Sequence, residues 1–402
     1  MNTFNTDDIV PVSELKHRIA ALQGHLNQNR FDAALILQAT DLFYFAGTTQ
    51  QGHLYVPKDA EPILMVRKSF ERARAESQLE IVEPLASLSE IRPILQRHGC
   101  RPPSSIGMEL DVLPVNLYRK YSQLFADSKI GDISHAIRLV RAIKSPYEID
   151  RITLAAGLAD QVASLIKAEL REGITEVEFA GKIEARARAL GHQGMVRMRL
   201  WGSEMFYGHL MCGDSAAVPS ALSSPTGGAA MSPAFSQGPG FKSIQPNQPI
   251  LFDYVFAHKG YLADHTRIFA LGDLPDKLMK AHEAMLALQA KLQTEMRPGV
   301  IVGDIYKSAI DFAAESGLGD YFMGAEKQRI RFIGHGIGLE LDEYPFLAKG
   351  QQMKLEPGMV IALEPKVVIP GMGVVGVENT HLVTKTGLER LTHYPDEIEI
   401  LE

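Results

Sequence analysis

The chain has 402 residues, a formal net charge of −7, and an ordinary globular composition with 46% hydrophobic and 22% charged residues. Its length exceeds the size at which one hydrophobic core stops growing, so two domains are expected. The negative charge and the lack of a Lys/Arg cluster argue against nucleic-acid binding. No secretory pattern and no bilayer-spanning apolar run occur, and the two cysteines, Cys100 and Cys212, suit neither a disulfide framework nor a cysteine zinc site. A cytoplasmic protein is therefore expected.

The first part of the chain is expected to form a small α/β domain, residues 1–140. Apolar residues at helical spacing predict helices over 14–29, 69–79 and 87–98. Short apolar runs bounded by polar residues predict strands at 33–38, 53–56 and 62–66.

The remainder, residues 141–402, is expected to form an α+β domain. A helix over 147–172 ends before Gly173, and Thr175 begins a T-E-V-E capping signature for a helix to about Leu190. The Gly/Pro/Ser-rich stretch 213–248 is interpreted either as a flexible surface loop or as the rim of a pocket. The predicted elements after it are a strand pair (249–269), two helices (275–296 and 303–316) and a β-rich end (329–400).

The strand pair carries two acidic residues, Asp253 and Asp264, among Leu, Phe, Tyr and Ile. If His258 and Lys259 form a two-residue turn, Asp253 lies directly opposite Asp264, with Cβ atoms about 4.5–5.5 Å apart. Two carboxylates at this separation repel each other unless a cation lies between them. The alternative is a solvated hairpin that both residues merely decorate.

Two further segments carry candidate ligands. His335 lies between glycines in GHGIG, where the imidazole can approach a ligand closely. Glu364 and Glu378 are predicted on two apolar strands joined by the turn 370–373. Burying acidic residues among Val and Ile is costly unless they are paired or bind a metal, although two exposed edge-strand glutamates remain an alternative.

Taken together, four carboxylates and one imidazole match the charge of two divalent cations. Two such ions bridged by carboxylates can hold a hydroxide and polarise a carbonyl group. Oxygen-rich ligation with one nitrogen favours Mn, with Fe, Co and Zn as alternatives.

The ordered elements D-x10-D, HGIG, EP and a Glu before N-T-x-L-V-T resemble the metallopeptidase family that includes methionine aminopeptidase, aminopeptidase P and prolidase. The stretch 137–155 is similar to the entry of the family's catalytic domain, and GYLADHTRIF to one of its strands. Residues 14–140, with DLFYFAGTT at 41–49, resemble the creatinase-type N-terminal domain. The resemblance spans nearly the whole chain and implies a pita-bread catalytic domain.

The resemblance also implies roles for the candidate residues. Asp253 would bridge two ions or chelate one, Asp264 and Glu378 would bridge them, and His335 would bind one ion. Glu364 would be both ligand and proton-transfer group, so the implied catalytic residues are Glu364 and His335. The implied enzyme is an Xaa-Pro dipeptidase or aminopeptidase that uses metal-bound hydroxide, acts on a short peptide and forms a homodimer.

Three positions depart from the family pattern. Ser220 stands where family peptidases carry a His upstream of the first Asp, Asp342 replaces the second His of HGIG-x-x-x-H, and Gly376 replaces an Arg. These changes leave open a non-peptidase enzyme on the same fold, resembling creatinase or a dimethylsulfoniopropionate lyase, with a small-molecule substrate. A non-catalytic binding module is a third reading, which the intact ligands disfavour.

Other histidines could supply a lost hydrogen-bond donor. His209, His265 and His381 lie near the candidate ligands in sequence. Because His265 alternates with Asp264 along a strand, it is expected to face away, so His209 is the strongest candidate. Asp342 is interpreted either as a base or amine-binding group, or as a capping residue.

Overall fold

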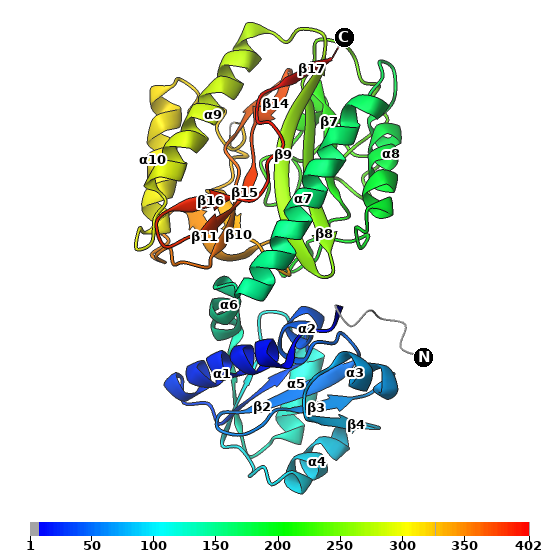
Figure 1. Ribbon diagram of the computed structural model, residues 1–402, viewed down its shortest axis with the longest axis vertical. Coiled ribbons are helices and arrows are strands. Elements are labelled where there is room, and N and C mark those ends of the chain that lie inside the picture. The colour runs from blue at the N-terminus through cyan, green and yellow to red at the C-terminus, as the bar shows by residue number, and fades with distance from the viewer. Residues whose placement is uncertain (1–7, 326, 402) are drawn as a thin grey trace. The chain divides into compact units, whose positions relative to one another are not determined.

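The computed structural model describes residues 8–325 and 327–401 and separates two compact units, Met1–Arg141 and Ala142–Glu402 (Figure 1). Residues 1–7, which include most of the segment on which the expected lack of a secretory leader rests, lie outside the described residues. In the described parts of the chain, no helix combines the length and apolar character needed to cross a bilayer. Cys100 and Cys212 are both free thiols.

The first unit is a six-stranded mixed sheet with helices, in the strand order β4-β3-β2-β1-β5-β6. Its strands are β1 (Ala33–Ile36), β2 (Gly52–Pro57), β3 (Ile63–Val66), β4 (Ile81–Pro84), β5 (Ser105–Met108) and β6 (Lys129–Asp132). Its helices are α1 (Val12–Gln28), α2 (Ala39–Ala46), α3 (Phe70–Glu76), α4 (Ile91–Arg97), α5 (Val115–Leu124) and α6 (Ser134–Ala142). The central strands β1, β2 and β3 are buried along their whole length, because helices cover them.

In its described residues, the second unit contains four long helices, two sheets and a separate hairpin. The helices are α7 (Pro146–Glu169), α8 (Glu176–Ala189), α9 (Asp276–Glu295) and α10 (Val302–Glu315). One sheet has the order β17-β9-β8-β7, formed by Glu399–Leu401, Tyr261–Leu271, Ile250–His258 and Gly208–Cys212. The other has the order β11-β10-β12-β15-β16, formed by Glu343–Ala348, Phe332–Gly336, Val360–Leu363, Asn379–Val383 and Leu388–Arg390. The hairpin pairs β13 (Lys366–Ile369) with β14 (Gly373–Gly376).

Capping signals in the sequence define the start of both helices that open this unit. The Ser145 hydroxyl accepts a hydrogen bond from the Glu148 N–H, and Thr175 does the same for Glu178. The first helix ends at Glu169, slightly before the predicted end at Glu172. Both helices pack on the β7-β8-β9 sheet (Figure 1).

The pleat of β8 decides which side chains reach the opposite face of that sheet. Phe252, Tyr254 and Phe256 belong to the core beneath α7 and α8, whereas Leu251 belongs to the core formed with α9 and α10. Successive side chains of a strand point to opposite faces. Asp253 therefore faces away from α7 and α8, toward the second sheet.

The hairpin register differs from the predicted one. The turn is formed by Lys259 and Gly260, both with positive φ (49° and 93°), rather than by His258 and Lys259. A tight turn of this kind needs positive φ at both central positions, which glycine adopts without strain. The register consequently shifts by two residues, and Asp253 pairs with Thr266 instead of Asp264. Because the shift is even, both aspartates still face the same side.

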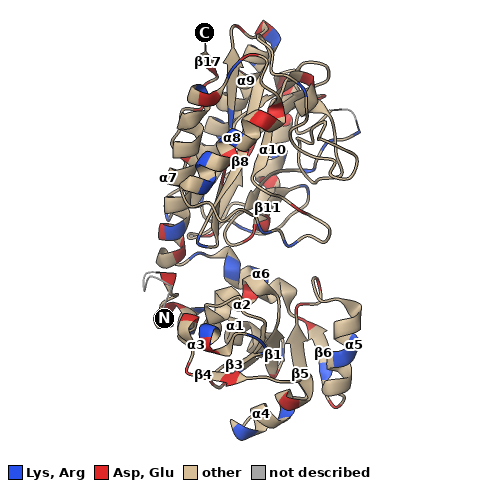
Figure 2. Cartoon of the chain, turned by 90° about the vertical axis from the view of Figure 1, so that its right-hand side faces the viewer, with Lys and Arg blue, Asp and Glu red and all other residues tan. Residues whose placement is uncertain are grey.

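Acidic and basic residues are interspersed along the described helices, for example on α7 (Figure 2). This pattern is typical of solvated helix faces.

Candidate metal centre

The structure brings the five candidate ligands together around one pocket in the second unit. Asp253 lies on β8, Asp264 on β9 and His335 on β10, while Glu364 and Glu378 lie between strands. The pocket, including its opening to solvent, has a volume of about 580 Å³. Four of the five candidate ligands are buried, and the fifth, Asp253, is partly exposed.

Glu364 and Glu378 were predicted on strands, and this detail is wrong. Glu364 follows the end of β12, where Pro365 lacks an N–H and interrupts the ladder. Glu378 follows β14 and forms an isolated bridge with Thr266 of β9. Both glutamates therefore lie in short segments between strands, Glu364 between β12 and β13 and Glu378 between β14 and β15. Both line the pocket.

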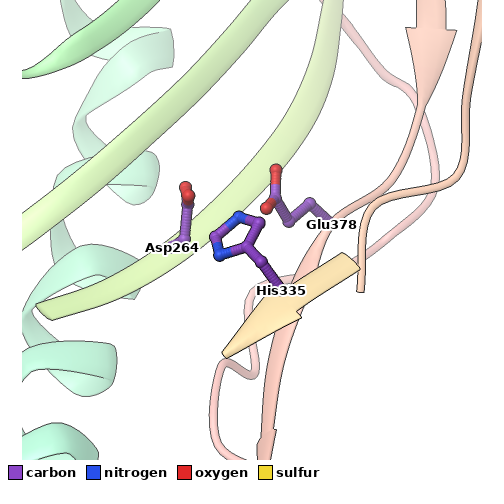
Figure 3. A group of neighbouring side chains, drawn as sticks. All are labelled: Asp264, His335 and Glu378. Carbon is purple, nitrogen blue, oxygen red and sulfur yellow. The ribbon is translucent and has the colours of Figure 1, made fainter. Parts of the chain in front are cut away.

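Asp264, His335 and Glu378 form the part of the centre that fits a metal ion (Figure 3). One ligand atom from each lies within 4.8 Å of the others, and the three side chains point toward one another. The Oδ1 atom of Asp264 is buried and has no hydrogen-bond partner among the residues that the structure describes. The His335 Nδ1–H donates to the Gly336 carbonyl at 3.1 Å, which leaves Nε2 available as a ligand atom. These three residues therefore suit a divalent cation.

Burial and repulsion from neighbouring carboxylates favour protonation of Asp264 and Glu378 in the absence of metal. Burial, followed by the charges of Glu378 and Asp253, raises the pKa of Asp264 well above its usual value. Burial raises the pKa of Glu378 to about 7, and Glu364 adds to this effect, although Lys366 opposes it. A bound divalent cation would displace these protons, so metal affinity is expected to rise with pH.

Lys366 also lies inside the centre, and the sequence interpretation missed it. The lysine is 1% exposed, and its Nζ lies 2.6 Å from Glu378 Oε2, 2.8 Å from Glu364 Oε2 and 3.5 Å from Asp253 Oδ2. Burial alone would lower the pKa of Lys366, but the surrounding carboxylates raise it well above its usual value. One signal could have revealed this lysine: Glu364 and Lys366 are two residues apart in an apolar segment, so they can share a face.

His209 lies directly opposite Asp253 in the β7–β8 pair. Its Nδ1 is 3.0 Å from the Thr226 hydroxyl, which donates to Asp253 Oδ2 at 3.3 Å. Burial lowers the pKa of His209, although the charge of Asp253 opposes this. Thr226 comes from the 213–248 stretch, and Leu222, Ser223 and Ser224 from the same stretch line the pocket. This arrangement supports the pocket-rim interpretation of the stretch.

The three positions that depart from the family pattern have different environments. Asp342 lines the pocket, with Oδ1 3.9 Å from His335 Nδ1. Ser220 is not among the lining residues, and its hydroxyl accepts a hydrogen bond from the Leu222 N–H in a turn. Gly376 pairs with Lys366, and a Cβ at this glycine would lie 2.4 Å from the Pro365 carbonyl oxygen.

The structure places two of the candidate histidines outside the pocket. The His265 ring lies 3.6 Å from Asp160 of α7, on the opposite face of β9 from Asp264. His381 on β15 accepts a hydrogen bond at Nε2 from Gln293 of α9, at 2.8 Å.

The environment of His381 predicts acid-dependent stability. Burial, with the charge of Arg390, lowers the pKa of His381 to about 4. The folded state therefore prefers the neutral ring, whereas the unfolded state takes up a proton below about pH 6.5. The free energy of unfolding is unaffected above pH 6.5 and decreases by about 2–3 kcal/mol as the pH falls toward 4. Urea unfolding at pH 7 and pH 4.5 should show a smaller acid loss in His381→Gln than in the wild type. An identical loss in both proteins would contradict this assignment.

Known proteins match both units. Residues 150–385 match metallopeptidase family M24, and residues 18–143 match the creatinase/prolidase N-terminal domain. The chain is 28% identical to an Xaa-Pro dipeptidase of Lactobacillus delbrueckii subsp. lactis over 394 residues, covering 94% of this chain and 98% of that protein. It is also 28% identical to an Xaa-Pro dipeptidase of Pyrococcus furiosus, covering 94% and 98% of the two chains.

Solved structures match along almost the whole chain. An Xaa-Pro dipeptidase from Bacillus anthracis has a TM-score of 0.82 at 25% identity, covering 96% of this chain and all of the other. The prolidase from Pyrococcus horikoshii OT3 has a TM-score of 0.79 at 25% identity, covering 95% and 99%. The expected pita-bread fold of the second unit is thereby confirmed. The chain belongs to metallopeptidase family M24, is a metal-dependent hydrolase, and combines the family's catalytic domain with a creatinase/prolidase N-terminal domain.

Proposed function

We propose that the protein is a metal-dependent Xaa-Pro dipeptidase or aminopeptidase. The observation that carries this proposal is the convergence of Asp264, His335 and Glu378 beside Glu364 in one pocket. A bound divalent cation would supply Lewis acidity and lower the pKa of a water molecule. The similarity to Xaa-Pro dipeptidases supports a peptidase over the creatinase-like alternative.

Glu364 is the proposed proton-transfer group. It is 5% exposed, and its Oε1 lies 3.9 Å from His335 Nε2, beside the proposed metal ligands. Its Oε2 accepts a hydrogen bond from Lys366, which holds the carboxylate in place. In the proposed reaction, Glu364 accepts the proton of the attacking water and delivers it to the leaving nitrogen.

The walls of the pocket suit a short peptide with an apolar residue. Its apolar lining includes Met198, Leu200, Met205, Phe332 and Leu341. Asp342 adds a buried carboxylate, which we propose pairs with the α-ammonium group of the substrate. Such a charge-assisted hydrogen bond would favour substrates with a free N-terminus.

The contact between Thr226 and Asp253 predicts a specific loss of function. Thr226→Val keeps the shape of the side chain but removes the hydroxyl that links His209 to Asp253. Outer contacts of metal ligands typically change affinity or activity by about 10–100-fold. We expect a loss in this range for metal affinity or kcat/KM, with Thr294→Val on the exposed face of α9 as control. Equal kinetics and metal affinity in both variants would exclude this role.

The proposed ligand residues and metal follow from the ligand chemistry and from the family. Asp253, Asp264, His335, Glu364 and Glu378 are the proposed ligand set, with Mn favoured over Fe, Co or Zn because four of the five are carboxylates. Two ions are predicted from the sequence. A homodimer is proposed from the resemblance to the family, and a cytoplasmic location is proposed from the cysteine usage and the apolar pattern of the sequence.

Hydrolysis of a defined peptide panel tests the proposed function. Purified protein equilibrated with Mn²⁺ is assayed against Xaa-Pro dipeptides and Xaa-Pro-Xaa tripeptides, with Glu364→Gln as the background control. Turnover of at least one peptide above this background is expected, and chelation should remove it. Absence of such turnover in a metal-loaded, folded preparation would refute the peptidase assignment.

A further inference from the structure

We infer that the Lys366 ammonium takes the place of one of the two divalent cations, so that the centre binds a single metal ion. This inference rests on the proposed metal centre but is independent of the peptide substrate. It revises the number of ions predicted from the sequence and assigns the metal to Asp264, His335 and Glu378, whereas Asp253 and Glu364 contact the ammonium.

The five candidate ligands divide into two groups that share Glu378. Asp264, His335 and Glu378 converge on one point and leave Asp264 Oδ1 without a hydrogen-bond partner. The carboxylates of Asp253, Glu364 and Glu378 instead surround Lys366 Nζ, at 3.5, 2.8 and 2.6 Å. A second divalent ion would need the oxygen atoms that the ammonium already occupies, since paired ions lie only about 3.5–4 Å apart.

The packing of the hairpin holds this ammonium inside the centre. The Lys366 N–H contacts Met323 Sδ, and the Lys366 carbonyl accepts a hydrogen bond from the Met323 N–H at 2.9 Å. Across the hairpin, Lys366 pairs with Gly376, where a Cβ would lie 3.1 Å from Lys366 Cγ and 2.7 Å from its Cα. The glycine at position 376 therefore leaves room for the lysine stem.

The pairing of Lys366 with Gly376 also identifies the strand that supplies the cation. Position 376 on β14 is a glycine and brings no side chain, whereas Lys366 stands opposite it on β13. The cationic side chain therefore comes from β13, and it enters the carboxylate cluster.

Repulsion between neighbouring cations also favours one metal ion. A second divalent ion bound to the oxygen atoms that surround Lys366 Nζ would lie in direct contact with the ammonium group in a buried cluster. Buried charges are stable only when they are paired, so the ammonium and a second divalent ion compete for the same position.

Metal stoichiometry tests the inference without an activity measurement. Protein freed of metal is equilibrated with Mn²⁺, and the bound metal per chain is measured by elemental analysis, with electron paramagnetic resonance as a second readout. The wild type should bind one ion per chain and give the spectrum of isolated Mn²⁺. Lys366→Ala should bind two ions per chain and show spin coupling between neighbouring ions.

Two further variants serve as controls. Lys366→Arg keeps a cation at the position and should remain at one ion, and Lys385→Ala removes an exposed lysine and should behave as the wild type. If Lys366→Ala does not fold, the wild-type and Lys366→Arg stoichiometries still decide the question. Two spin-coupled ions per wild-type chain would overturn the inference and leave the peptidase proposal intact. No bound metal in any variant would overturn the metal centre itself.

Discussion

Replacement of Glu364 by Gln is expected to lower kcat/KM for an Xaa-Pro dipeptide by about 10²- to 10⁴-fold, which is the usual contribution of a positioned general acid–base group. The substitution preserves the size of the side chain and leaves an amide oxygen that can still accept from Lys366, which donates to Glu364 at 2.8 Å in the wild type. It removes the carboxylate that accepts and returns a proton. Initial rates normalised to bound metal measure this loss.

The control for this variant is Glu356→Gln, which makes the same chemical change at an exposed position. This variant should retain wild-type kinetics. If Glu364→Gln kept more than a tenth of the wild-type kcat/KM per bound ion, the proton-transfer role would have to be assigned to another residue, and Asp342 in the same pocket would be the next candidate.

Replacement of Asp264 by Asn is expected to act in opposite directions on stability and on metal binding. In the metal-free protein, Asp264 is buried among other carboxylates and its Oδ1 has no partner. A neutral amide removes the free-energy cost of protonating this buried carboxyl group, so the free energy of unfolding at neutral pH should increase by about 1–3 kcal/mol. Metal affinity should fall by more than about 100-fold, since even outer contacts of ligands contribute 10–100-fold.

Thermal unfolding with and without Mn²⁺ measures both effects. At a metal concentration of about 100 times the Kd, the wild type should gain about 2.7 kcal/mol, whereas the variant should gain almost nothing. Asp273→Asn at an exposed position is the matched control and should respond to metal as the wild type does. A metal-induced stabilisation of Asp264→Asn equal to that of the wild type would remove Asp264 from the ligand set.

Local signals in the sequence predict most of the architecture around the site. Helix caps at Thr175, apolar strand patterns and the ordered motifs indicate the elements and bring the five acidic and histidine residues to one region. The hairpin register was less predictable, because both His258-Lys259 and Lys259-Gly260 fit a two-residue turn. The structure forms the turn from Lys259 and Gly260, because glycine adopts the positive φ of 93° without strain.

Two residues of the centre depend on contacts that local patterns do not determine. A lysine beside apolar residues, such as Lys366, is usually exposed at a strand edge, and its burial becomes evident only when three carboxylates from distant segments surround it. Thr226 lies in a Gly/Pro/Ser-rich stretch without periodicity. Its contact with Asp253 is formed by the path of a long loop rather than by any repeated spacing.

The most direct test of the metal centre is anomalous diffraction from crystals of the wild-type protein grown with Mn²⁺. One Mn peak per chain is expected, bound by Asp264, His335 and Glu378, with Lys366 Nζ still in contact with Glu364. No peak at these residues in an otherwise intact structure would contradict the metal centre. A second peak at the position of the lysine ammonium would contradict the single-ion assignment.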